Sequence, residues 1–294
     1  MDIKKELKEK QLFVEDILNK YTIKEGKPGI IFESFNYSLF VGGKRIRPIL
    51  LIESCKAVGG DIKEAYPLMA AIEMIHTYSL IHDDLPCMDD DELRRGKPTN
   101  HVLYGEATAL LAGDSLLNLA YETMIKNCKK ANNITRYVDA MEVIADAAGI
   151  NGMVAGQVMD MISEGKEPNG ETLDFIHDNK TGALLRACIL SGAIIGGADE
   201  EKMESFKKYA DSIGLMFQVV DDILDVVSDS ETLGKNVGMD EERNKMTYPY
   251  VYGLEKSYEK VEQLLNIALE SISDFDESAD FLRNLAVYLS SRKN

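Results

Sequence analysis

The sequence predicts an all-α fold in which a single domain covers residues 1–294. Apolar residues recur at helical spacing through nearly every long segment, and convincing strand alternation is absent. The breaks between these segments are short, and neither a linker nor a shift in composition divides the chain. Because 45% of the 294 residues are hydrophobic, the chain can fill one large core. We therefore expect a bundle of ten or more helices.

The predicted helices follow one another between polar, glycine-rich breaks. The clearest of them cover residues 68–85, 113–128, 203–227 and 254–272. The breaks fall at 22–29, 58–60, 94–100, 163–170, 196–200 and 228–238. The segments 68–85 and 207–227 are apolar nearly all round, so they should be central, buried helices.

Composition argues against several classes of protein. The net charge of −17 disfavours a nucleic-acid partner, because phosphates would be repelled overall. The N-terminal segment MDIKKELKEK has no apolar region of the signal-peptide kind, and the longest apolar runs are too short for a transmembrane segment. The four cysteines are scattered, without a CxxC pair, which is typical of reduced thiols. We therefore expect a cytoplasmic protein.

A first acidic motif lies in IHDDLPCMDDDELRRGKP, residues 81–98, where negative charge is followed at once by positive charge. His76 and Asp83 are seven residues apart and should share one face of the preceding helix. Pro86 should end that helix and let Asp89 return towards Asp83. The segment therefore predicts two neighbouring carboxylates beside a basic loop.

A second acidic motif lies in FQVVDDILD, inside an otherwise apolar helix. Gln218, Asp221, Asp222 and Asp225 have the spacing of a single helix face. Carboxylates crowded at a buried helix cost free energy unless a cation compensates them. Magnesium fits best, because it takes one or two carboxylates together with phosphate oxygens and water. An EF-hand is excluded because DxDxDG is absent, and zinc is disfavoured because histidine and cysteine ligands do not cluster.

Basic residues cluster at four places in this acidic chain. They are found in GGKRIRP (42–48), LRRGKP (93–98), NKTGALL (179–185) and LGKNVGMDEERNKMTYP (233–249). Glycine beside lysine or arginine lets backbone and side chain approach a phosphate together. We expect KTGALL to begin a helix and so to present amide donors to an anion. Together the clusters predict a ligand with at least two phosphate-bearing parts.

These motifs resemble those of the trans-isoprenyl diphosphate synthase family. DDLPCMDDDELRRGKP and FQVVDDILD are similar to the family's paired aspartate-rich motifs. GGKRIRP, HTYSLIHDD, AGDSLLNLAYE, GMVAGQVMD, KTGALL, LGKNVGMD and KMTYP are similar to its other motifs, in the same order. The resemblance runs from about residue 28 to the C-terminus and implies a helical bundle of the isoprenoid-synthase type around a central active-site cavity. It also implies a homodimer, for which 113–128 is the candidate interface helix.

The resemblance implies a role for each matching residue. Three Mg²⁺ ions, replaceable by Mn²⁺, would bind the motif aspartates Asp83, Asp84, Asp89, Asp221 and Asp225. The diphosphate of the allylic substrate would contact Arg94, Lys180, Thr181, Gln218 and Lys235, with Lys180 and Lys235 assisting catalysis. Isopentenyl diphosphate would contact Gly43, Lys44, Arg47, His76 and Arg95, and Lys245 would be a further substrate contact.

The implied reaction is the condensation of isopentenyl diphosphate with an allylic diphosphate. The chain matches the bacterial farnesyl group of the family best, because an aromatic residue lies five places before Asp83 and the motif contains the two-residue insertion PC. Tyr78 would close the end of the tail cavity and the small Ser79 would leave room, which predicts a fifteen-carbon product.

Other functions remain open on the sequence. The first alternative is a geranyl or geranylgeranyl diphosphate synthase. A terpene cyclase is disfavoured because DDILD is typical of chain-elongating synthases, and a non-catalytic subunit because both aspartate motifs are present. A helical scaffold would not need acidic clusters on buried helices.

Overall fold

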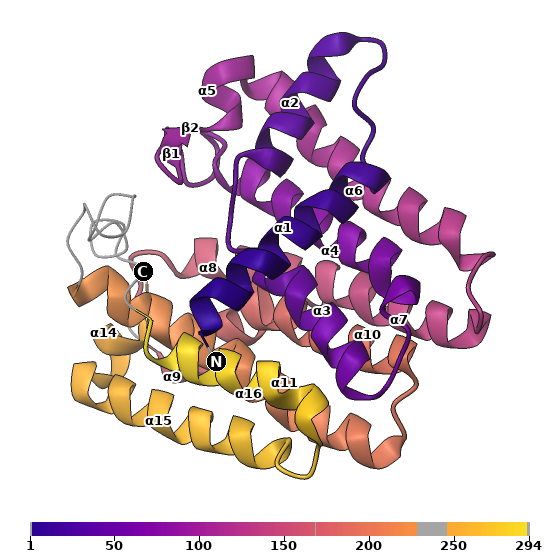
Figure 1. Ribbon diagram of the computed structural model, residues 1–294. Coiled ribbons are helices and arrows are strands. Elements are labelled where there is room, and N and C mark those ends of the chain that lie inside the picture. The colour runs from indigo at the N-terminus through magenta and orange to yellow at the C-terminus, as the bar shows by residue number, and fades with distance from the viewer. Residues whose placement is uncertain (1, 168, 228–245, 293–294) are drawn as a thin grey trace. The chain divides into compact units, whose positions relative to one another are not determined.

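The computed structural model describes residues 2–167, 169–227 and 246–292. Over these ranges the chain is helical except for one short hairpin, so the all-α prediction of ten or more helices is confirmed (Figure 1). No helix within them combines the length and apolar composition that crossing a bilayer would require. Their four cysteines are free thiols, two of which, Cys55 and Cys188, are buried.

The chain divides into two compact units. The N-terminal unit comprises residues 2–49 and 63–134, and the C-terminal unit comprises residues 50–62 and the described residues from 135 onwards. The single domain over 1–294 and the central cavity stay predictions.

The N-terminal unit is built around a buried helix. It contains α1 (Ile3–Tyr21), α2 (Gly29–Phe40), the start of α3 (Ile46–Ala57), α4 (Ile62–Asp83), β1 (Leu93–Arg94), β2 (Lys97–Pro98), α5 (Asn100–Tyr104) and α6 (Glu106–Cys128). Every side chain of α4 from Leu68 to Ile75 is at most 2% exposed, which confirms the prediction that this helix is central. The α2 helix packs against α5 and α6.

A β-hairpin occupies the break that the sequence predicts at 94–100. Its two antiparallel strands pair Leu93 with Pro98 and Arg94 with Lys97. The turn residues Arg95 and Gly96 both have positive φ, 56° and 71°, as a tight two-residue hairpin turn requires. Arginine at the first turn position is unusual, and this is why the sequence indicated only a break.

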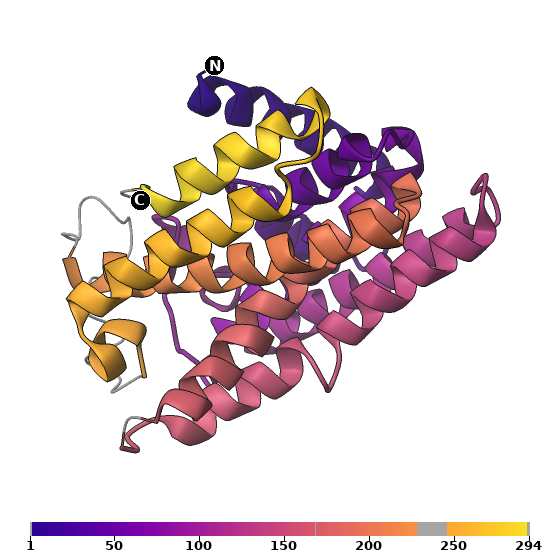
Figure 2. The ribbon, with the colours of Figure 1, turned by 90° about the horizontal axis from the view of Figure 1, so that it is seen from below.

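The C-terminal unit is organised around the long helix α11 (Glu200–Val227). Its other elements are the end of α3, α7 (Ile134–Ala148), α8 (Met153–Ser163), α9 (Gly170–Ile176), the π-helical turn η1 (His177–Gly182), α10 (Ala183–Gly196), α14 (Tyr248–Tyr252), α15 (Leu254–Ser271), the 3₁₀ turn η2 (Glu277–Ala279) and α16 (Asp280–Ser290). Figure 2 shows α15 running beside α11, which also packs against α10 and η1. Most side chains of α11 from Ser212 to Asp225 are buried, as predicted.

Candidate functional site

The first aspartate motif begins where α4 ends. The helix ends at Asp83, two residues earlier than predicted, and the chain then turns through Pro86. The backbone N–H of Asp89 donates to the carbonyl oxygen of Asp83 at 2.9 Å, so the predicted return of Asp89 is confirmed. Both aspartates are half-buried. The next residue, Asp90, has a φ of 51°, a backbone conformation that residues other than glycine adopt uncommonly.

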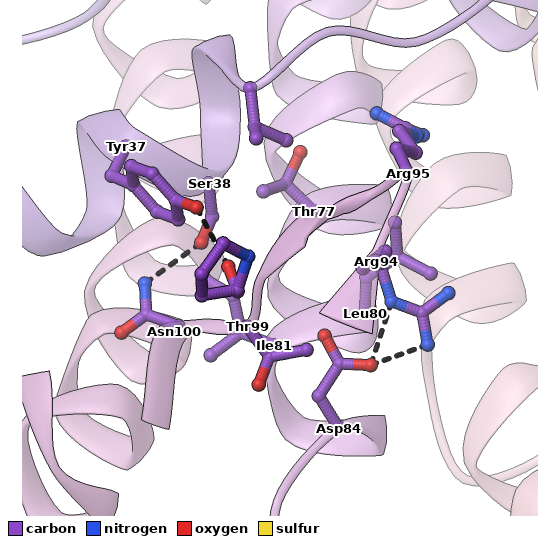
Figure 3. Close-up of a pocket in the computed structure, with 12 residues that line it drawn as sticks. Tyr37, Ser38, Thr77, Leu80, Ile81, Asp84, Arg94, Arg95, Thr99 and Asn100 are labelled. Atoms are coloured by element: carbon purple, nitrogen blue, oxygen red, sulfur yellow. Dashed lines mark hydrogen bonds and ion pairs between the residues drawn. The ribbon is translucent and has the colours of Figure 1, made fainter. Parts of the chain in front are cut away.

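Asp84 is buried and holds an arginine of the hairpin (Figure 3). Its Oδ1 accepts from Arg94 Nε at 2.7 Å and lies 2.5 Å from Arg94 Nη2. Burial raises the pKa of Asp84 to about 6, although Arg94 acts in the opposite direction. In this structure the carboxylate is thus occupied by Arg94, which also lies 3.6 Å from Asp91. Metal binding by Asp84 and diphosphate binding by Arg94 stay predictions.

A pocket of about 380 Å³ lies beside this ion pair in the N-terminal unit (Figure 3). Its charged lining comes from Asp84, Arg94 and Arg95. The hydroxyl of Tyr37 donates to the Pro98 carbonyl at 2.7 Å and so connects α2 to strand β2. The pocket thus brings the end of α4 and the hairpin arginines together.

Four arginines act on His76, which lies on α4. Arg47 Nη1 is 3.4 Å from His76 Nε2. Burial, followed by Arg47, Arg95, Arg94 and Arg45, lowers the pKa of His76 well below its ordinary value, so the imidazole is neutral near pH 7. The structure thus groups Arg47, His76 and Arg95 as predicted. Such positive charge beside a neutral imidazole favours an anionic ligand.

Arg45 has a structural role that its sequence motif did not reveal. Its side chain is 1% exposed and Nη1 lies 2.6 Å from Glu73 Oε1, while Nη2 donates to the Leu39 carbonyl at 2.7 Å. The backbone φ of 54° turns the side chain inward at the start of α3. Of the three basic residues in GGKRIRP, Lys44 is exposed and Arg47 is half-buried.

Gly43 lies directly against Arg95. A side chain at this position would overlap the Arg95 guanidinium, and the φ of Gly43 is 144°. Arg95 Nη1 also donates to the Gly42 carbonyl. The two motifs GGKRIRP and LRRGKP are therefore in contact, which the resemblance implied when it assigned both to one substrate.

The prediction that KTGALL begins a helix is wrong. Lys180 and Thr181 lie in the π-helical turn η1, inside helical structure that continues from Gly170 to Gly196. Their backbone amides are therefore not at a helix N-terminus. The turn instead lies in mid-helix, where π-helical turns occur frequently at functional sites.

The second aspartate motif is held by contacts within the C-terminal unit. Gln218 Nε2 donates to Asp222 Oδ1 at 2.8 Å, which confirms that the two share one face of α11. Asp222 Oδ2 lies 3.1 Å from His177 Nε2 and accepts from the backbone N–H of Tyr248 at 2.8 Å. Asp225 is buried on the same helix.

Asp221 pairs with an arginine from the C-terminal end of the chain. Arg292 Nη2 lies 2.6 Å from Asp221 Oδ1 and donates to the Phe217 carbonyl at 3.0 Å. The Arg292 guanidinium carbon also lies 4.1 Å from the centre of the Phe217 ring. Arg292 thus contacts the second aspartate motif from the C-terminal end of the chain.

A second pocket, of about 430 Å³, lies in the C-terminal unit. It is lined by Asp160, Ile176, His177, Lys180, Gln218, Asp222, Met246 and Thr247. Within this pocket, Lys180 Nζ is 2.6 Å from Asp160 Oδ2. Lys180 and Gln218, both predicted to contact the allylic substrate, line the same pocket. Sequence reasoning missed Asp160 and His177 as parts of this site. The signals were that Asp160 ends the matching motif GMVAGQVMD, to which no residue role had been assigned, and that His177 lies three residues before Lys180.

The donor chemistry of these residues fits magnesium. Within the described ranges, no group of three or more histidine, cysteine or acidic side chains converges as a complete ligand set. Mg²⁺ does not need one, because it keeps several waters and binds through one or two carboxylates together with substrate phosphates. Asp83 and Asp89 of the N-terminal unit and Asp221 of the C-terminal unit are half-buried carboxylates of this kind, and their binding of Mg²⁺ stays a prediction. Lys235 and Lys245 lie outside the described residues.

Tyr78 is buried one turn before the first aspartate motif. Its ring packs edge-on against His82 at 5.6 Å between ring centroids, and burial, with a smaller contribution from Tyr121 of α6, raises the pKa of Tyr78 to about 12. The hydroxyl of Ser79 donates to the His76 carbonyl at 2.9 Å. The role of both residues in product length stays a prediction.

Comparison with known proteins identifies a family. The family model described as polyprenyl synthetase matches residues 28–285. A geranylgeranyl diphosphate synthase from Cyanophora paradoxa is 48% identical over 98% of this chain and 96% of its own length. Geranylgeranyl pyrophosphate synthase 11, chloroplastic, from Arabidopsis thaliana is 51% identical over 91% of this chain and 76% of its own. An FPP/GFPP synthase structure from Zymomonas mobilis is 34% identical with a TM-score of 0.87, covering 99% of each chain.

The expected farnesyl product is wrong in light of these relatives. The relatives near 50% identity are named as geranylgeranyl diphosphate synthases, which was the alternative. The error came from inferring cavity depth from Tyr78, Ser79 and the PC insertion, all of which lie in one stretch of sequence. The Tyr78 ring packs against His82, and the depth of a cavity depends on every side chain that lines it, which spacing in one helix does not give.

Proposed function

Because the chain belongs to the polyprenyl synthetase family, we propose that it is a prenyltransferase that adds isopentenyl diphosphate to allylic diphosphates and releases geranylgeranyl diphosphate. The observation that carries the substrate class is the basic group of the N-terminal unit, in which Arg47 lies 3.4 Å from His76 and Arg95 lies against Gly43 of the adjoining motif. A diphosphate compensates such clustered positive charge. The twenty-carbon product is supported by the names of the relatives at about half identity.

The isopentenyl diphosphate is assigned to the basic group of the N-terminal unit. Arg47 and Arg95 offer planar guanidinium donors to its phosphate oxygens, and Gly43 lets the backbone approach. Neutral His76 can accept from Arg47 or donate to the ligand without adding positive charge. Exposed Lys44 contributes a mobile charge at the rim.

The allylic diphosphate is assigned to the two aspartate motifs with Arg94, Lys180, Thr181, Gln218 and Lys235. Magnesium held by Asp83, Asp89 and Asp221 would neutralise charge on the leaving diphosphate. Lys180 would exchange its contact with Asp160 for one with the diphosphate. Thr181 and Gln218 add neutral hydrogen bonds to the same group.

The proposed step breaks the carbon–oxygen bond of the allylic diphosphate, and the diphosphate leaves with the electron pair. The double bond of isopentenyl diphosphate attacks the resulting allylic cation and forms the new carbon–carbon bond. A proton is then lost to the released diphosphate, as the family resemblance implies. The chain's residues bind and orient the two diphosphates, and Lys180 stabilises the departing charge.

We also propose that the protein is a homodimer and that it acts in the cytoplasm. The α6 helix carries exposed apolar side chains at Leu111 and Ile125, 56% and 57% exposed. Such side chains favour an interface on α6, the helix that contains the predicted interface segment 113–128. Sedimentation at working concentration tests it: an active monomer would contradict the proposal.

Chromatography of dephosphorylated products from labelled isopentenyl diphosphate with dimethylallyl, geranyl or farnesyl diphosphate tests the function. We expect a twenty-carbon product from each primer, and only in the presence of Mg²⁺ or Mn²⁺. Asp83→Ala and Asp221→Ala should each lose several orders of magnitude in rate, because charge on the leaving group would be left uncompensated. No transfer by the wild type, or full turnover in excess chelator, would refute the proposal, whereas a fifteen-carbon end product would refute only the chain length.

A further inference from the structure

A buried histidine to which the proposed reaction assigns no role joins the π-helical turn to the second aspartate motif. His177 of η1 and Asp222 of α11 are each 3% exposed, and His177 Nε2 lies 3.1 Å from Asp222 Oδ2. The backbone N–H of Tyr248 also donates to Oδ2 of this carboxylate, and the Gln218 amide donates to Oδ1. Asp222 is therefore buried and held by three groups of the protein, whereas its neighbour Asp221 is half-buried and pairs with Arg292.

Two glycines bring the same turn into backbone contact with the helices on either side. A side chain at Gly156 of α8 would overlap the backbone of Lys180. A Cβ at Gly214 of α11 would lie 3.3 Å from the Gly182 Cα. Because side chains do not separate these backbones, a small rotation of η1 would carry Lys180 directly out of place.

The contact between His177 and Asp222 can hold η1 in a fixed orientation relative to α11. His177 lines the same pocket as Lys180, Gln218 and Asp222, so one hydrogen bond joins the two elements that supply the proposed diphosphate contacts. Nε2 can donate to Asp222, and this hydrogen bond orients the ring. Nδ1 has no hydrogen-bond partner among the described residues, so the Asp222 bond is the one that orients the ring there.

We propose that His177 is a positioning residue for the allylic half of the site. Its bond to Asp222 holds η1 and α11 in register, so that Lys180 and Gln218 meet the same diphosphate group as the second aspartate motif. The inference rests on the proposed function, and it predicts an effect on one substrate only. A histidine that merely filled the core would affect both substrates equally or neither.

The test compares His177→Gln, which keeps a donor near the Nε2 position, with His177→Leu, which removes it. Gly156→Ala displaces η1 by a different route, and Gly29→Ala is the matched control, because its nearest neighbour would be 3.9 Å away. Initial rates are measured against each substrate separately. Calorimetry with inorganic diphosphate and Mg²⁺ measures binding without turnover, and circular dichroism checks the fold.

We expect His177→Leu and Gly156→Ala to raise the allylic KM by about 10–100-fold, the usual cost of losing an orienting hydrogen bond near a metal site. The isopentenyl KM should stay within about two-fold, since uniform effects would indicate general damage. His177→Gln should recover most of the loss, and the affinity for diphosphate should follow the same order. Gly29→Ala should match the wild type.

An equal rise in both KM values in folded protein, or no recovery by His177→Gln relative to His177→Leu, would overturn the proposal. If His177→Leu does not fold, a wild-type allylic KM in Gly156→Ala would overturn it instead. Failure of the proposed function would give a different result, because neither the wild type nor any variant would transfer a prenyl group. The order of the affinities for inorganic diphosphate would still decide the role of His177.

Discussion

The buried ion pair between Arg45 and Glu73 should be indispensable to the stability of the N-terminal unit. The two side chains are 1% and 3% exposed, and Nη1 and Oε1 are 2.6 Å apart. Glu73 Oε2 has no hydrogen-bond partner among the described residues, and Arg45 is the cation in direct contact with this carboxylate. Arg45→Met would leave this carboxylate buried and would also remove the donor to the Leu39 carbonyl.

The magnitude follows from burial. At an effective dielectric constant of about 20, unit charges about 4 Å apart attract by about 4 kcal/mol. Desolvation offsets most of this in the intact pair, but removal of one partner leaves the other uncompensated and costs about 3–5 kcal/mol. We expect Arg45→Met to be destabilised by that amount, while Arg45→Met/Glu73→Leu should recover much of it, because both charges are then absent.

The assay is urea unfolding followed by circular dichroism, with Lys20→Met as the matched control. Lys20 and Asp16 are 2.5 Å apart, but their side chains are 60% and 63% exposed. Removal of a charge from such a surface pair should cost less than about 1 kcal/mol. The reasoning is refuted if Arg45→Met is no more destabilised than Lys20→Met, or if the double variant is as unstable as Arg45→Met.

Three further predictions concern the site. Arg47→Ala should raise the KM for isopentenyl diphosphate and Lys180→Ala the KM for the allylic substrate, each by about 10-fold or more; initial rates that show the reverse selectivity would contradict the assignment. Tyr78→Ala should lengthen the product beyond twenty carbons by removing a buried ring, and an unchanged chromatogram would show that Tyr78 does not limit length. Because the folded pKa of Asp84 is raised from 3.8 to about 6, the native state binds more protons in this window and stability should fall as pH rises through it. In metal-free protein, Asp84→Asn should remove this dependence of the free energy of unfolding on pH. An identical slope in the wild type and the variant would contradict the prediction.

Local features of the sequence were sufficient for the fold class and for the family. Helical periodicity predicted α4 and α11 within a few residues, because burial of an apolar helix leaves a repeat in the chain itself. Spacing also predicted the return of Asp89 to Asp83 and the shared face of Gln218 and Asp222, since both are short-range consequences of helix geometry.

Only the tertiary structure distinguished the residues within each motif. Arg45 and Arg47 are two positions apart, yet the first is buried against Glu73, 28 residues away, and the second lies beside His76. The π-helical turn likewise depends on the backbone of α8 and α11, and His177 gained its role from Asp222 on another helix. The product length predicted from the sequence was wrong for the same reason. Burial, ion pairing and cavity depth are properties of side chains that meet in space, and residue spacing along the chain encodes only neighbours within a few turns.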